Sequence, residues 1–139
     1  MSAASNYTED RTLDFWLKAN SQTSTAPATV YVGLFTSDDS TGATGENLEA
    51  GTLTNEVSGG SYARKSATFG TISNGSVSTS ANVTFDTATA NWGTITHVAV
   101  MDASTTGNVL FYGALDTSKT IESGDTFQIT SGNLTVSLA

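Results

Sequence analysis

From residue 28 onward the sequence breaks into short runs of β-branched and aromatic residues, each bounded by Gly, Asn, Asp or Ser. This pattern of short apolar runs separated by turn-forming residues is typical of antiparallel strands joined by tight turns. Asn74-Gly75 is the strongest turn signal, because a type I′ hairpin needs two residues that accept positive φ. The run at residues 30–35 carries apolar side chains on both faces, so we expect a central strand there. About eight such strands suit a two-sheet sandwich or jelly roll.

The stretch with helical periodicity lies before the strands. Leu13, Trp16 and Leu17 recur at the spacing of one helix face, and such an apolar face needs a surface to pack on. We expect that surface to be the chain's own sandwich. The predicted organisation is a mainly β, antiparallel single domain over residues 1–139, with a flexible arm (1–5), one short N-terminal α-helix (6–20) and a β sandwich (28–139).

Charge and composition argue against several classes of protein. The chain has a formal net charge of -8, so its long-range field repels nucleic acid and anionic membranes. It contains no cysteine, which rules out disulfides, thiol nucleophiles and cysteine metal sites. Its N-terminus lacks the pattern of a secretory signal, and no apolar stretch approaches the length of a membrane span. We expect a soluble cytoplasmic product without cofactor, nucleic-acid partner or membrane partner.

Catalytic candidates are few. His97 is the single histidine and lies in a strand run without the serine, aspartate or second histidine that would suggest a triad or metal motif, so a half-buried strand histidine is favoured. Asp14, Asp86 and Asp102 lie in separate segments, and nothing in the spacing pairs them for glycoside hydrolysis. We therefore expect no catalytic residues.

A polar stretch at residues 37–55 is too long for a hairpin, and we expect a mobile surface loop. It holds Asp38, Asp39, Glu46 and Glu49, whose carboxylates could coordinate calcium. Their spacing does not fit an EF-hand loop, so a solvated acidic loop without a metal is the favoured interpretation.

Four aromatic residues could form the binding platform of a carbohydrate-binding module: Tyr31, Tyr62, Trp92 and Tyr112. In a β sandwich most aromatic side chains are core or cross-strand partners instead, and we favour that interpretation. Trp92 follows a polar run, which suggests that it closes one end of the sandwich.

Arg64 and Lys65 are two of the five basic residues and follow a glycine pair. Neighbours in a regular strand point to opposite faces, so these two cannot form one basic patch. A phosphate cradle needs glycine amides that open a helix, whereas here a strand follows. We therefore expect Arg64 to reach an acidic group with its bidentate fork, within the subunit or across an interface.

Segments along the chain, taken in order, resemble one family: APATVYVGLFTSD, EVSGGSYARKSATF, VTFDTATANWGTITHVAVMDA and NVLFYGALDTSKTIESGDTFQITSGNLTVSL. They are similar to a widespread group of small virion proteins of tailed bacteriophages, commonly labelled phage tail fibre or virion-associated protein. The resemblance extends over nearly the whole chain, including the N-terminal helix. It implies a non-enzymatic structural component of the virion, assembled in the host cytoplasm.

Because the chain lacks the long repetitive shaft of a fibre, the favoured expectation is a capsid decoration (cement) protein that stabilises the head. Its partners would be the major capsid protein or other virion proteins and further copies of the chain, with a trimer suggested by analogy. The alternative is a tail or fibre-associated module with weak affinity for host glycans. An enzyme such as a depolymerase is least favoured. The interface candidates are Leu13, Trp16, Leu17, Tyr62 and Arg64.

Overall fold

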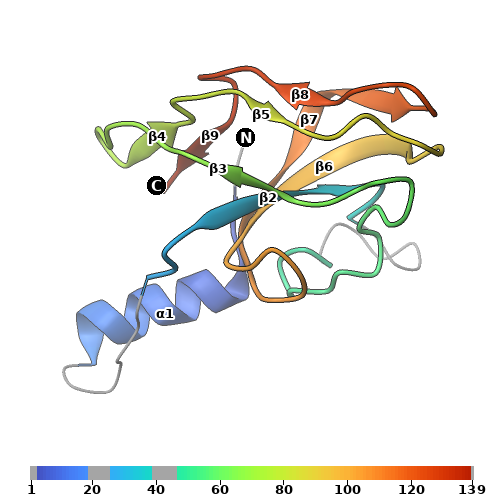
Figure 1. Ribbon diagram of the computed structural model, residues 1–139. Helices are drawn as coiled ribbons and strands as arrows, with labels where there is room; N and C mark the ends of the chain where they lie inside the picture. The colour runs from blue at the N-terminus through green and yellow to red at the C-terminus, as the bar shows by residue number, and fades with distance from the viewer. Residues whose placement is uncertain (1–2, 19–25, 39–46, 139) are drawn as a thin grey trace.

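A computed structural model of the chain describes residues 3–18, 26–38 and 47–138. These residues form one helix and nine strands (Figure 1). The elements are β1 (Ala3–Ala4), α1 (Asn6–Leu17), β2 (Val30–Phe35), β3 (Lys65–Ala67), β4 (Ser76–Ser78), β5 (Val83–Thr84), β6 (Gly93–Met101), β7 (Val109–Ile121), β8 (Gln128–Ile129) and β9 (Thr135–Ser137). The predicted mainly β class with a short N-terminal helix is confirmed.

The strands form two layers. The larger layer is a five-stranded sheet with the order β1-β7-β6-β2-β3, and the smaller layer consists of the two-stranded sheets β4-β9 and β5-β8. Figure 1 shows the small sheets lying over one face of the large one. All of these pairs are antiparallel, so the predicted antiparallel sandwich is confirmed. The strand predicted to be central is β2, which lies between β6 and β3.

Apolar side chains cover both faces of the large sheet. One cluster lies between the two layers and includes Leu34, Val98, Phe85 and Trp92. A second cluster comprises Phe35, Leu48, Ala99, Met101 and Val109, with Tyr31 and Tyr112 packed against it. Leu34 and Phe35 are adjacent in β2 and point to opposite faces, as strand geometry requires. This explains why the first run is apolar on both faces.

The predicted turn at Asn74-Gly75 is present, with φ of 51° and 74° at its two residues. The runs on either side do not form one continuous hairpin, however. β3 pairs with β2, and β4 pairs with β9, while the two arms meet near the turn and at an isolated bridge between Phe69 and Thr79. Pairing with strands distant in sequence therefore outweighs the local pairing that the turn predicts.

The N-terminal segment differs from the prediction. Residues 1–2 lie outside the described part of the chain, but Ala3 and Ala4 pair with Tyr112 and Phe111 of β7. Ser5 is fully buried, and its amide donates to the carbonyl of Leu110 at 3.1 Å. The prediction of a flexible arm is therefore wrong for residues 3–5, because their backbone completes an edge of the large sheet.

The helix is shorter than predicted. It ends at Leu17, where residues up to 20 were expected, and residues 19–25 lie outside the described part. Within the described residues, no helix has the length and apolar character needed to cross a membrane.

Candidate functional site

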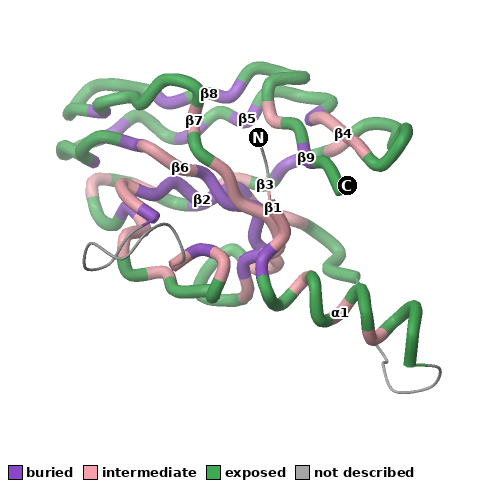
Figure 2. The backbone as a smooth tube through the Cα atoms, turned by 180° about the vertical axis from the view of Figure 1, so that it is seen from behind, coloured by how far each residue is buried: buried purple, intermediate pink, exposed green. Residues whose placement is uncertain are grey.

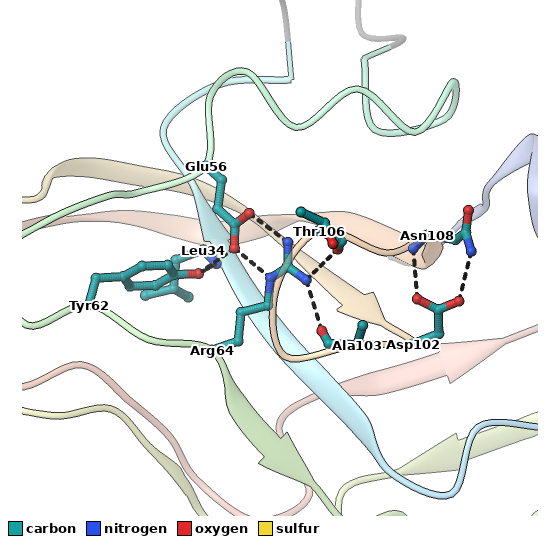
Figure 3. Close-up of polar contacts among 8 residues, drawn as sticks. All are labelled: Leu34, Glu56, Tyr62, Arg64, Asp102, Ala103, Thr106 and Asn108. Atoms are coloured by element: carbon teal, nitrogen blue, oxygen red, sulfur yellow. Dashed lines mark hydrogen bonds and ion pairs between the residues drawn. The ribbon is translucent and has the colours of Figure 1, made fainter.

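Arg64 directly precedes β3, and its side chain lies inside the fold (Figure 3). Its Nε donates to Glu56 Oε1 at 2.6 Å, and its Nη2 donates to Glu56 Oε2 at 2.7 Å. This is a bidentate pair, the strong geometry of an arginine with a carboxylate. The acidic partner predicted for Arg64 is therefore present, and it belongs to the same chain.

Tyr62 completes this group, which we call the Arg64 cluster (Glu56, Tyr62 and Arg64). The Tyr62 hydroxyl donates to Glu56 Oε1 at 2.9 Å and accepts from the amide of Leu34 at 2.9 Å. Burial raises the pKa of Tyr62 well above its ordinary value, so the hydroxyl keeps its proton. Burial alone would lower the pKa of Arg64, but the hydrogen bonds and charge of Glu56 raise it overall.

The loop between β6 and β7 supplies the remaining acceptors. Arg64 Nη1 donates to the carbonyls of Ala103 at 2.8 Å and Thr106 at 2.7 Å. Asp102 holds this loop in place, because its carboxylate accepts from the backbone amide of Asn108 at 2.7 Å and from Asn108 Nδ2 at 2.8 Å. Gly107 has φ of 72°, and an added Cβ would lie 2.5 Å from Asp102 Oδ1. Only glycine fits this crowded, left-handed position.

Arg64 therefore joins β3, the segment at Glu56 and the loop between β6 and β7. The residue is 7% exposed, and four hydrogen bonds join its guanidinium to acceptors of the same chain, so it is directed into the fold. Tyr62 is half-buried in the same network. Two of the predicted interface residues thus lie within the fold of one chain, and their interface role stays a prediction.

Lys65 points elsewhere, as alternation predicted. Its Nζ lies 2.8 Å from Asp86 Oδ2 on the surface. The two neighbouring basic residues therefore form no joint patch, and the prediction that Arg64 reaches an acidic group is confirmed.

The four aromatic residues considered as a carbohydrate-binding platform lie in two separate places in the fold. Trp92 is 5% exposed and donates from Nε1 to the Gly60 carbonyl at 2.9 Å. It makes edge-to-face contacts with Tyr62 at 5.5 Å and with Phe85 at 6.5 Å between ring centroids. Tyr31 and Tyr112 pack against the second cluster. The preferred interpretation of these residues as core and cross-strand partners is confirmed.

The catalytic candidates are not brought together. His97 is half-buried in β6, with Nδ1 2.8 Å from Thr96 Oγ1. Asp14 pairs with Lys18 at 3.2 Å, while Asp86 and Asp102 take the separate contacts described above. In the described residues, no group of three or more His, Asp and Glu side chains could hold a metal ion.

The acidic loop is only partly as predicted. Asp38 is 6% exposed, and its Oδ1 accepts from the Leu48 amide at 2.7 Å. The prediction of a solvated carboxylate is therefore wrong for Asp38, which anchors the backbone of Leu48, a member of the second cluster. Glu49 is half-buried, and Asp39 and Glu46 lie outside the described residues.

Helix α1 is attached to the sheet through its N-terminal end. Ser5 caps the helix, accepting from the Thr8 amide at 3.3 Å, and its hydroxyl donates to the Val109 carbonyl. Thr8 Oγ1 donates to the Leu110 carbonyl at 2.8 Å. The side of the helix that carries Thr8 therefore faces the sheet.

The opposite side of α1 is apolar and exposed. At about 100° per residue, Leu13 and Leu17 fall across the helix from Thr8. The exposed fractions are 56% for Leu13, 59% for Phe15, 75% for Trp16 and 75% for Leu17. Trp16 lies about 80° from Thr8 around the helix axis, and Phe15 about 20° from it, on the anchored side. We call Leu13, Trp16 and Leu17 the helix face. The prediction that the apolar stripe packs on the chain's own sandwich is wrong, because the anchored side of the helix carries threonines instead.

Figure 2 shows the C-terminal part of α1 extending away from the strands with most of its residues exposed. Phe15 and Trp16 contact each other edge to face at 5.2 Å. A cluster of large apolar side chains at this exposure is characteristic of a protein-protein contact. The structure thus presents an exposed apolar surface suited to binding. The ion pair between Glu56 and Arg64, in contrast, holds segments of the fold together.

Comparison with known families supplies the class of protein. Residues 3–137 match the sequence model of a family of bacteriophage fibre proteins, which makes the chain a structural protein of the virion. It belongs to the family described as podophage GP4 fiber I protein gp80. No curated protein matches the chain. The resemblance to phage fibre-type proteins is confirmed at this level, whereas the match does not support capsid decoration.

Proposed function

We propose that this protein is a non-enzymatic structural module of a bacteriophage tail fibre or of its attachment to the particle. The family match over residues 3–137 carries the proposal, because it spans nearly the whole chain. The arrangement of polar groups supports it, since Arg64, Glu56 and Asp102 are all engaged in bonds that hold the fold together.

The helix face is the proposed attachment surface, and its partner is another protein of the virion with an apolar groove that accepts a helix. Aromatic side chains dominate the binding energy of protein interfaces when they enter a well-packed pocket. Trp16 is suited to that role, because it is 75% exposed on a helix whose bonds to the sheet, among the described residues, come from its first turn.

Host-glycan binding is not part of this proposal. The platform that would stack on a sugar ring needs exposed aromatic faces, whereas Trp92 is buried and Tyr62 packs against Trp92 and Phe85.

The copy number of the protein in purified particles tests the proposed function. Quantitative mass spectrometry would compare this chain with the major capsid protein. A fibre component is expected in a handful to a few dozen copies per particle. A ratio on the scale of the capsid lattice would contradict the fibre proposal and support capsid decoration instead.

A further inference from the structure

The sandwich is open along one flank. A cavity of about 800 Å³ lies between β7 and the strands β8 and β9. Apolar side chains from both layers line it, among them Phe111, Leu115, Phe127, Ile129, Leu134 and Val136. The interior of a sandwich is normally closed by interdigitating side chains from both sheets. Here, the apolar lining continues to an open groove.

The backbone of β7 beside this groove has few partners. β1 pairs with Phe111 and Tyr112, and within the described residues no strand pairs with β7 beyond Tyr112 on that side. On the other side, the register with β6 passes from Ala114 opposite His97 to Lys119 opposite Ile95. Residues 115–118 therefore have no counterpart in β6.

Unpaired strand backbone is a template for another strand, because its N–H and C=O groups can pair with a second chain. Residues 116–120 of β7 are exposed, and Leu115 is half-buried at the groove. An added strand would place alternate side chains over the apolar lining and leave the others in solvent. Both the edge and the groove therefore fit one kind of ligand, an extended polypeptide.

We propose that this groove receives an extended segment of another virion protein, which adds a strand along β7 and inserts apolar side chains between the layers. This inference rests on the proposed function and gives the protein a second contact surface besides the helix face. Charge decides between the possible occupants. The groove lining contains both Asp116 and Lys119, so its local charges balance, but the whole chain carries a net charge of -8. A second copy is therefore repelled, and a neutral or basic segment is favoured.

A charge placed in the groove tests this contact. Leu115→Glu puts a carboxylate where the added strand would bury it, whereas Ser123→Glu introduces the same charge at an exposed position beyond β7 and outside the cavity lining. We expect Leu115→Glu to lower incorporation into particles about tenfold or more, since an unpaired buried carboxylate is costly. Ser123→Glu is expected to match the wild type. Both variants would be produced in a host infected with phage lacking the gene.

A second readout is independent of how Leu115→Glu folds. The chain contains no cysteine, so Ala114→Cys and Ser123→Cys each provide a single thiol at an exposed position. In the free protein both should react with a maleimide. In particles, we expect the thiol at position 114 to react about tenfold more slowly or less, while the thiol at position 123 stays reactive.

Equal reaction at position 114 in free and assembled protein, with normal incorporation of Leu115→Glu, would overturn the inference. A dimer of the free protein that Leu115→Glu dissociates would also overturn it, because the occupant would then be a second copy. If the wild-type protein were absent from particles, the proposed function itself would fail, which is a distinct result.

Discussion

Arg64 and Trp16 occupy opposite environments within one small protein. Arg64, a charged residue, is 7% exposed and has each of its three guanidinium nitrogens bonded inside the fold. Trp16, a large apolar residue, is 75% exposed on a helix anchored at its other end. Polarity alone would place each residue in the other's environment. The contrast separates two roles, since the Arg64 cluster holds three segments of the chain together, whereas the side chains of the helix face are largely exposed to solvent.

The largest effect on stability is expected at the Arg64 cluster. Arg64→Ala leaves Glu56, whose side chain is 16% exposed, without its cation and deprives two carbonyls of their donor. Breaking a largely buried ion pair by removing one partner costs about 3–5 kcal/mol. Urea unfolding would measure this loss as a lower midpoint.

Lys65→Ala is the matched control, because it removes the neighbouring basic residue. Its partner Asp86 is 59% exposed, and exposed pairs contribute about 0–1 kcal/mol. Similar midpoints for the two variants would contradict the role assigned to Arg64.

The loop that presents carbonyls to Arg64 provides the next test. Gly107→Ala would place a methyl group 2.7 Å from the Ala103 Cβ at a φ of 72°, and such backbone strain costs about 1–3 kcal/mol. Gly51→Ala shares the positive φ, at 80°, but meets nothing within 4 Å. A larger loss of stability at position 107 than at position 51 would show that loop packing matters in addition to the backbone angle. Equal losses would reject this explanation.

Tyr62→Phe should have a smaller effect that depends on pH. The variant loses hydrogen bonds to Glu56 and Leu34, at a cost of about 1 kcal/mol near neutral pH. Because the folded state raises the pKa of Tyr62 above the ordinary value of 10.0, its neutral hydroxyl stabilises the fold below that pH. This contribution is lost as the pH rises further.

The measurement for this variant is the free energy of unfolding across the alkaline range. The difference between wild type and Tyr62→Phe should shrink above about pH 10. A difference that stays constant with pH would show that ionisation of the Tyr62 hydroxyl does not cause the loss of stability at alkaline pH.

The sequence predicts much of this contrast, but not all of it. The central strand β2, the turn at Asn74-Gly75 and an acidic partner for Arg64 follow from local patterns and charge, although the sequence left open whether that acid lies in the same chain. The identity of that acid does not, because Glu56 lies in a segment without periodicity and reaches Arg64 only through tertiary packing. The burial of Asp38 was missed for a similar reason, since its contact with Leu48 closes a loop that carries no repeating signal.

The helix shows a different limit of sequence patterns. The spacing of Leu13, Trp16 and Leu17 identifies an apolar face, but a pattern does not state which surface covers it. The decisive signals are Ser5 and Thr8, whose hydroxyls bond to carbonyls of β7 and fix which side of α1 faces the sheet. Polar residues at the start of the helix thus determine the orientation of its apolar residues.

The most direct test of this account is the occupancy of a helix-face variant in phage particles. Leu13→Ser, Trp16→Ser and Leu17→Ser would be combined in the full chain, with Ile72→Ser, which is 73% exposed in the wild type, as the control. We predict that the combined variant unfolds within about 0.5 kcal/mol of the wild type but is missing from particles, whereas the control is incorporated normally. Wild-type occupancy of the combined variant would contradict attachment through α1.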